Sequence, residues 1–359
     1  MSEQRSISLY MHMGWPMNYP FSPKTWSMSE WNSWIDWVSE LGVRELILWP
    51  AFEMLDSLDD PDQFTWVKKV SEIIRKCHAN GLSIALGRSA NAYADGSVFY
   101  SQRHQHTLNY CFPEEETYQV KIIDLLEKIF NELPSFDKWW VIDADPGNAM
   151  ETEPKTLITC IKKQLELLPR ETAVAYWMWG GWTSLRGQKD GWRNEKQSFW
   201  IDALNEFNQL ERKKEVWYCW QGHLESLKNF EFEQKHFAYH FLEPEPSIPY
   251  PYHTDEKQSC LFTPDKTKGS LILNLQTPCL RNGTLENFIK YGSLKQREMQ
   301  LLEKLWIWDR EKYDEMYLKL KTLTQNESRE IKKEALKEWQ DYTGMPDVAK
   351  RGYLIERNS

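Results

Sequence analysis

The chain has 359 residues, of which 41% are hydrophobic and 27% are charged; these values are ordinary for a globular protein of one large or two smaller domains. Its formal net charge of −9 argues against a nucleic-acid partner, because phosphate binding requires a basic surface. No stretch approaches about 18 consecutive apolar residues, and no charged-then-apolar leader opens the chain, so we expect neither a membrane-spanning helix nor a secretory signal.

The cysteines indicate the redox environment. All six are scattered, with no C-x-x-C pair and no zinc-type spacing. This pattern predicts isolated buried thiols in a reduced, cytoplasmic protein. Nothing in the sequence calls for a cofactor.

Strand-like and helix-like segments alternate from the start of the chain. The first four predicted strands span residues 7–12, 44–50, 82–87 and 138–145. Helices are predicted between them over residues 29–41, 64–79 and 114–133, because apolar residues recur there at helical spacing. The fourth strand runs through two tryptophans into Asp143-Ala144-Asp145 and ends at a Pro-Gly turn.

The second half repeats this alternation. Four more strands are predicted over residues 172–179, 215–220, 236–242 and 269–275, with helices over 155–168 and 197–211. Eight strands in one such series predict an α/β fold of the (β/α)8 TIM-barrel type over residues 1–285. The charged remainder, residues 286–359, is predicted to be a helical C-terminal extension that packs on the barrel or forms a homo-oligomer contact. An open doubly wound sheet is the alternative, although the G-x-G-x-x-G fingerprint is missing.

A barrel places catalytic residues just after the ends of its strands. Carboxylates, amides, indoles and an arginine gather at these positions, a mixture that suits a sugar, since polar groups bind hydroxyls and indoles stack on sugar rings. The predicted substrate-binding residues are His12, Trp15, Arg88, Asn91, Trp179, Trp220, His240 and Gln276.

Asp143 and Asp145 are the leading catalytic candidates. They lie two residues apart in an extended segment and therefore project to the same side. Two close carboxylates cannot easily both ionise, so one becomes an acid beside a base, as glycoside hydrolysis requires. Alternatively, Asp145 caps the following turn and Asp143 pairs with Arg88.

Two further acidic residues follow predicted strands. Glu243 is a third catalytic candidate, as nucleophile or base, or else a solvated charge in a proline-rich loop. For Glu53 we favour a solvated acidic loop together with Asp56, Asp59 and Asp60. The stretch from Arg103 to His106 is also expected to be an exposed loop.

Histidines and tryptophans leave further alternatives. His12, His223 and His240 could hold a metal, but a lone histidine at a strand end is more often a hydrogen-bonding residue, and we expect no metal site. Arg88 either pairs with an acid or recognises an anionic substrate group. Trp177 and the helical Trp31, Trp34 and Trp37 are expected to be core residues.

The segment from Val141 to Gly147, the Trp-rich strand ends and Asn274-Leu275-Gln276-Thr277 resemble the glycoside hydrolases with hexosaminidase-type barrels. The resemblance spans residues 7–285 and is carried mostly by architecture. It implies that acids after the fourth strand protonate the glycosidic oxygen and orient the substrate's N-acetyl group. In that family the acids are adjacent or near-adjacent; in this chain the pair is Asp143-Ala144-Asp145, not a directly adjacent Asp-Glu or Asp-Asp.

The sequence therefore predicts a glycoside hydrolase with a carbohydrate substrate. Asp145 would be the general acid, and Asp143 the group that orients the substrate or stabilises positive charge. Trp15, Trp179 and Trp220 would form the sugar platform. The alternatives are a non-catalytic sugar-binding protein on the same scaffold and a metal-dependent lyase or isomerase.

Overall fold

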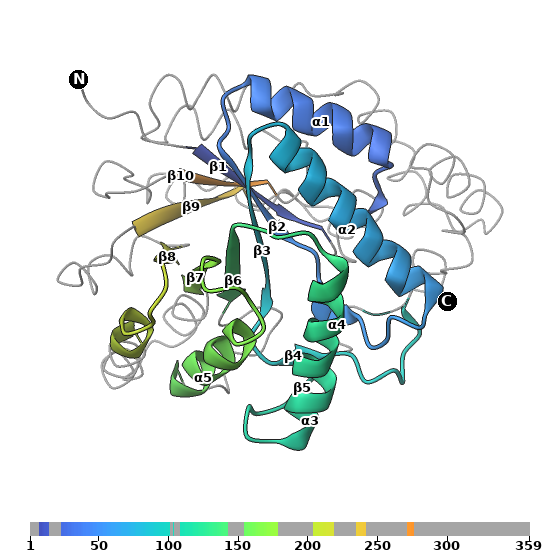
Figure 1. The fold of residues 1–359 in the computed structure, drawn as a ribbon, viewed down its shortest axis with the longest axis vertical. Coiled ribbons are helices and arrows are strands. Elements are labelled where there is room, and N and C mark those ends of the chain that lie inside the picture. Colours follow the sequence, from blue (N-terminus) through green and yellow to red (C-terminus); the bar gives the residue numbers. More distant parts are fainter. Residues whose placement is uncertain are drawn as a thin grey trace, which may run out of the picture.

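The computed structural model describes residues 7–13, 23–100, 103, 108–142, 154–178, 204–218, 235–241 and 271–275. Figure 1 shows the parallel strands at the centre of the molecule, with helices α1, α2 and α4 along one side and α5 below them. The predicted domain boundary at residue 285 and the helical C-terminal extension lie outside the described residues.

Eight of the described strands form one closed ring in the order β1-β10-β9-β8-β7-β6-β3-β2. Every neighbouring pair is parallel, and β10 closes the ring by pairing with β1. The predicted α/β barrel fold is thus confirmed. The barrel strands are β1 (Ile7–His12), β2 (Glu45–Trp49), β3 (Ser83–Ser89), β6 (Lys138–Ile142), β7 (Ala173–Met178), β8 (Lys214–Tyr218), β9 (Lys235–Phe241) and β10 (Leu271–Leu275).

Helices follow the first strands much as predicted. Ser27 and Glu30 form a capping box at the start of α1, and Asp60 caps α2, which has Pro61 in its first turn. The predicted helix over 114–133 is observed as one continuous helical stretch, in which the π-helical segment η6 lies between α3 and α4. The bounds are α1 (Met28–Glu40), α2 (Pro61–Ala79), α3 (Glu116–Tyr118), η6 (Gln119–Ile123), α4 (Asp124–Glu132) and α5 (Pro154–Leu165).

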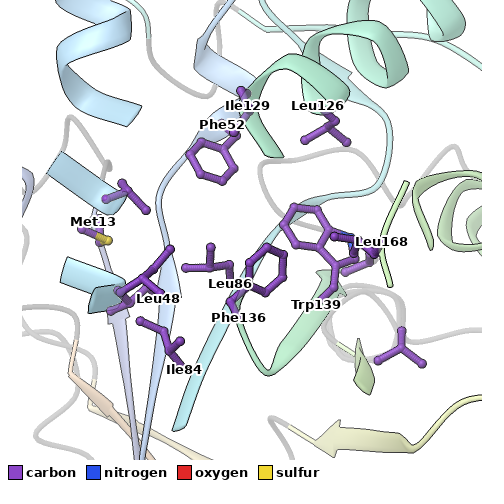
Figure 2. Close-up of a cluster of buried hydrophobic side chains, with 14 of the residues drawn as sticks. Met13, Leu48, Phe52, Ile84, Leu86, Leu126, Ile129, Phe136, Trp139 and Leu168 are labelled. Atoms are coloured by element: carbon purple, nitrogen blue, oxygen red, sulfur yellow. The ribbon is translucent and has the colours of Figure 1, made fainter. Parts of the chain in front are cut away.

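One hydrophobic layer lies between the strands and the helices. Figure 2 shows part of it, with Leu48 of β2, Leu86 of β3 and Trp139 of β6 near Leu126 and Ile129 of α4. The predicted core role of Trp31 and Trp34 is confirmed, since both are buried in this layer, and Trp37 packs against it. Cys77, Cys111 and Cys160 are free and buried, as expected for them.

A second, aromatic layer fills the barrel interior. It contains Tyr10, Trp49, Trp140, Trp177 and Trp217, all at most 2% exposed. The ring centroids of Trp140 lie 5.4 Å from those of Trp49 and 5.1 Å from those of Trp177. This confirms Trp177 as a core residue. A β-carbon on Gly87 would lie 2.0 Å from the Trp140 ring, so only glycine at that position admits the indole.

The sequence did not predict a small hairpin after β3. Its strands β4 (Ala92–Tyr93) and β5 (Asn109–Tyr110) pair antiparallel. Ala92, Ala94 and Leu108 of this insertion pack against Ala51 and Met54, which follow β2. The insertion therefore covers the segment after β2.

The sequence analysis also did not predict two short 3-10 helices, η2 (Pro23–Thr25) and η3 (Phe52–Met54). In the part of the chain that is described, no helix has both the length and the apolar character needed to cross a bilayer.

Candidate active site at the carboxyl end of the barrel

Arg88 and Asn91 are the predicted site residues whose side chains the structure describes. For His12 and His240 it gives the backbone: His12 pairs with Trp49, and His240 pairs with Asn274, which is two residues before Gln276. The other predicted site residues lie outside the described residues: Trp15, Asp143, Asp145, Trp179, Trp220, Glu243 and Gln276. Their roles stay predictions.

The segment after β2 turns sharply and brings Glu53 back over the strand. Ala51 has φ 55° and ψ 46°, a left-handed conformation that costs a non-glycine residue about 1–2 kcal/mol. The turn leads into η3 and lets the indole Nε1 of Trp49 donate to Oε1 of Glu53 over 2.7 Å. Strain of this kind concentrates at functional sites.

Glu53 is buried, with 2% of its surface exposed, so the expectation of a solvated acidic loop was wrong for this residue. Burial raises the pKa of the Glu53 carboxyl above 4.5, against the lowering effect of the Arg88 guanidinium and of hydrogen bonds from Trp49 and the Ser89 main chain. A buried carboxyl with a raised pKa at a barrel's carboxyl end is a candidate proton donor or hydrogen-bond donor.

Arg88 lies on β3 beside this carboxyl and is 1% exposed. Its Nε donates to the carbonyl of Ser89 over 3.0 Å, and a terminal guanidinium nitrogen donates to the carbonyl of Ala92. Burial lowers the pKa of Arg88, while the neighbouring Glu53 raises it. In this conformation Arg88 holds the turn after β3 and compensates the charge of Glu53. Its assignment to substrate binding stays a prediction.

Further hydrogen bonds fix the turn that carries Asn91. The carboxamide nitrogen of Gln164 donates to the carbonyl of Ala90 over 2.9 Å and to the hydroxyl of Tyr118 over 3.0 Å. The Nε1 of Trp139 donates to the same carboxamide's oxygen over 3.0 Å. The main-chain N–H of Cys111 donates to the Asn91 carbonyl over 3.3 Å. Asn91 is thus held at the carboxyl end of β3, 4% exposed.

Arg103 ties the hairpin insertion to the segment after β2. It is 6% exposed, so the prediction of an exposed loop was wrong for this residue. One terminal nitrogen donates to the carbonyl of Met54 over 2.7 Å and to Asp56 over 2.8 Å. Burial alone would raise the pKa of Asp56, but hydrogen bonds from Arg103 and Gln63 lower it overall. The ion pair between Arg103 and Asp56 therefore holds the hairpin insertion against the segment that carries Glu53.

At the opposite end of the barrel, buried charged side chains form ion pairs with one another. Lys138 Nζ lies 2.7 Å from Glu45 and 2.5 Å from Glu215. The Ser8 hydroxyl donates to Glu45 over 2.9 Å, and Trp217 Nε1 donates to Glu215 over 3.1 Å. Burial would lower the pKa of Lys138, but the two glutamates raise it overall. This network joins β1, β2, β6 and β8 at their amino ends.

We find no metal-ion site in the described residues, since no three His, Cys, Asp or Glu side chains converge there. The histidines of the metal-dependent alternative are not tested by this finding: His223 lies outside the described residues, and only the backbones of His12 and His240 are described.

No protein-family model and no curated protein sequence matches the chain. Among solved structures it is similar to a β-N-acetylhexosaminidase from Bacteroides fragilis, with 9% identity over 88% of this chain and 71% of that one, at a TM-score of 0.49. It is also similar to an α-amylase from Geobacillus thermoleovorans, with 11% identity over 84% and 77% of the two chains and a TM-score of 0.45. A third similar structure is an α-galactosidase from Geobacillus stearothermophilus, with 11% identity over 89% and 43% of the chains and a TM-score of 0.40. All three similarities are distant, with identities of at most 11% and TM-scores below 0.5.

Proposed function

We propose that this chain is a glycoside hydrolase whose active site lies at the carboxyl end of the barrel. One observation carries the proposal: β6 is a barrel strand that ends at Ile142, directly before Asp143 and Asp145. Ile142 pairs with Ser89 on β3 and with Trp177 on β7. The residue that precedes the acidic pair in the sequence therefore lies at the rim where barrel enzymes carry their chemistry, which supports the proposal.

In this proposal the two acids divide the work. Asp145 protonates the glycosidic oxygen as the leaving group departs, and Asp143 orients the substrate or stabilises the positive charge that develops on the sugar. Glu243 is the rival to Asp143 as nucleophile or base. Trp15, Trp179 and Trp220 form the platform on which the sugar ring stacks, and His12, Arg88, Asn91, His240 and Gln276 bind its hydroxyls.

Turnover of a panel of aryl glycosides tests this assignment. The Asp145→Asn variant keeps the size of the side chain but cannot donate the proton, so we expect a loss of turnover of about 10²- to 10⁴-fold. Asp59→Asn is the matched control, because Asp59 is an exposed aspartate in the loop before α2. Unchanged turnover in Asp145→Asn would remove Asp145 from the mechanism.

The same panel separates the hydrolase from the non-catalytic alternative. A hydrolase releases product from at least one glycoside. The non-catalytic alternative predicts that the protein binds a sugar in calorimetry. It also predicts that no product is released from any glycoside over days.

A further inference from the structure

The carboxyl half of the barrel interior holds three buried polar atoms that no described residue hydrogen-bonds. They are Oε2 of Glu53, Oγ of Ser89 and Nε1 of Trp140. The three residues are 2%, 3% and 0% exposed. Buried polar groups nearly always have a hydrogen-bond partner, because without one the free energy lost on removing them from water is not compensated. Three such atoms in one part of a barrel require an explanation.

These atoms belong to two neighbouring strands, β3 and β6, and to the segment that follows β2. Trp49 links two of the residues, since its indole N–H bonds to Glu53 and its ring lies edge-on to Trp140 with centroids 5.4 Å apart. The Ser89 main chain is one of the groups that lower the pKa of the Glu53 carboxyl. Ser89 stands two residues after Gly87, which pairs with Trp140 across β3 and β6. Glu53 follows β2 in η3, Ser89 is the last residue of β3, and Trp140 lies in the middle of β6.

We propose that Glu53, Ser89 and Trp140 form a subsite that binds hydroxyl groups of a neutral sugar. Trp140 stands three residues before Asp143 in the sequence, and the inference rests on the hydrolase proposal for its choice of ligand class. All three atoms are shielded from solvent in this conformation, so binding requires the side chains around them to rearrange.

The donor and acceptor set favours a neutral hydroxyl over a charged group. An indole N–H only donates, a serine hydroxyl donates and accepts, and a carboxyl can do both when it is protonated. The buried Arg88 guanidinium interacts with Glu53 and disfavours a cation there. The Glu53 carboxyl would in turn repel an anion once ionised. A sugar hydroxyl, which donates and accepts without charge, matches all three groups.

Calorimetric titration with glucose, galactose and N-acetylglucosamine tests the subsite. Ser89→Ala deletes only the hydroxyl and should weaken binding by about fivefold to tenfold, the effect of one neutral hydrogen bond. Glu53→Met should weaken binding at least as much, whereas Glu53→Gln, which can still donate and accept, should restore most of it. Ser71→Ala is the matched control, because its hydroxyl is also buried without a partner but lies in α2.

The outcomes separate this inference from the hydrolase proposal. Weaker binding in Ser89→Ala, with Ser71→Ala unchanged, supports the subsite even if Glu53→Met fails to fold. Wild-type affinity in Ser89→Ala overturns the subsite and leaves the hydrolase proposal standing. If none of the three sugars binds the wild-type protein, the subsite is overturned, and turnover of the aryl glycosides decides separately whether the hydrolase proposal survives.

Discussion

The two ends of the barrel differ in whether their buried polar groups have hydrogen-bond or ion-pair partners. At the amino end, Lys138 neutralises Glu45 and Glu215, and Ser8 and Trp217 add hydrogen bonds to the same carboxylates. At the carboxyl end, polar atoms of three buried residues are left without a partner among the described residues. This contrast fits our proposal that the carboxyl end binds a ligand while the amino end serves stability, the usual division in barrel enzymes.

The largest effect is expected from a variant that disrupts the ion-pair network at the amino end of the barrel. Lys138→Met leaves two buried carboxylates close together without their shared cation, so we expect the free energy of unfolding to fall by about 3–5 kcal/mol. Denaturant unfolding measures the loss. Lys68→Met is the control, since Lys68 forms an exposed ion pair with Glu132, and exposed pairs contribute about 0–1 kcal/mol. Equal losses in the two variants would contradict a stabilising role for the amino-end network.

A smaller effect is expected where β3 and β6 approach. Gly87→Ala places a methyl group 2.0 Å from the Trp140 ring, and overpacking of this kind costs about 1–3 kcal/mol. Thermal unfolding measures the loss, and weaker sugar binding should accompany it because Trp140 must shift. Gly81→Ala meets no atom within 4 Å but has φ +70°, so it measures backbone strain alone, about 1 kcal/mol. A Gly87→Ala variant as stable as the wild type would show that Trp140 does not pack on Gly87.

Glu53 should make stability depend on pH. Because its pKa is raised above 4.5 in the folded state, its contribution is fully present below pH 4.5 and is lost as the pH rises through the folded pKa. Glu53→Gln cannot ionise, so its free energy of unfolding should decline less over that interval. Urea unfolding at a series of pH values measures the difference. Parallel curves for the two proteins would mean that Glu53 ionises as freely in the folded chain as in the unfolded one.

The smallest effect is expected in the alkylation of buried cysteines, which compares how tightly the turn after β3 and the helical layer are packed. Burial raises the pKa of Cys77, Cys111 and Cys160 to about 12, so almost no thiolate is present at mildly alkaline pH. We expect none of the three to be alkylated by iodoacetamide in the native protein, and all three after unfolding, as read by mass spectrometry. Selective labelling of Cys111 in the native protein would show that the turn after β3 opens more readily than the core.

Much of the barrel could be predicted from sequence because its strands are short apolar runs with clear stops. The segments around Leu46, Ile84 and Val174 are buried on both faces and lie where they were expected. The interior position of Trp177 also followed from the strand pattern. These features depend on local periodicity, which is visible without knowledge of distant contacts.

Glu53 and Arg103 could not be placed in this way. Glu53 is followed by Asp56, Asp59 and Asp60, and Arg103 is followed by polar residues, so both segments look solvated. Both residues are buried because the hairpin insertion folds over the segment after β2, a contact between residues 49 positions apart in the case of Arg103 and Met54. A single sequence contains no local signal for such a contact.

Hydrogen–deuterium exchange, measured with and without whichever of the three titrated sugars binds, shows which end of the barrel holds the ligand. We expect new protection at Ser89, which ends β3, and in the segments after β2, β3 and β6, including Glu53. We expect no change at the amino ends of the same strands, near Glu45 and Lys138. Protection confined to the amino ends, or none at saturating sugar, would contradict the claim that the carboxyl end holds the ligand.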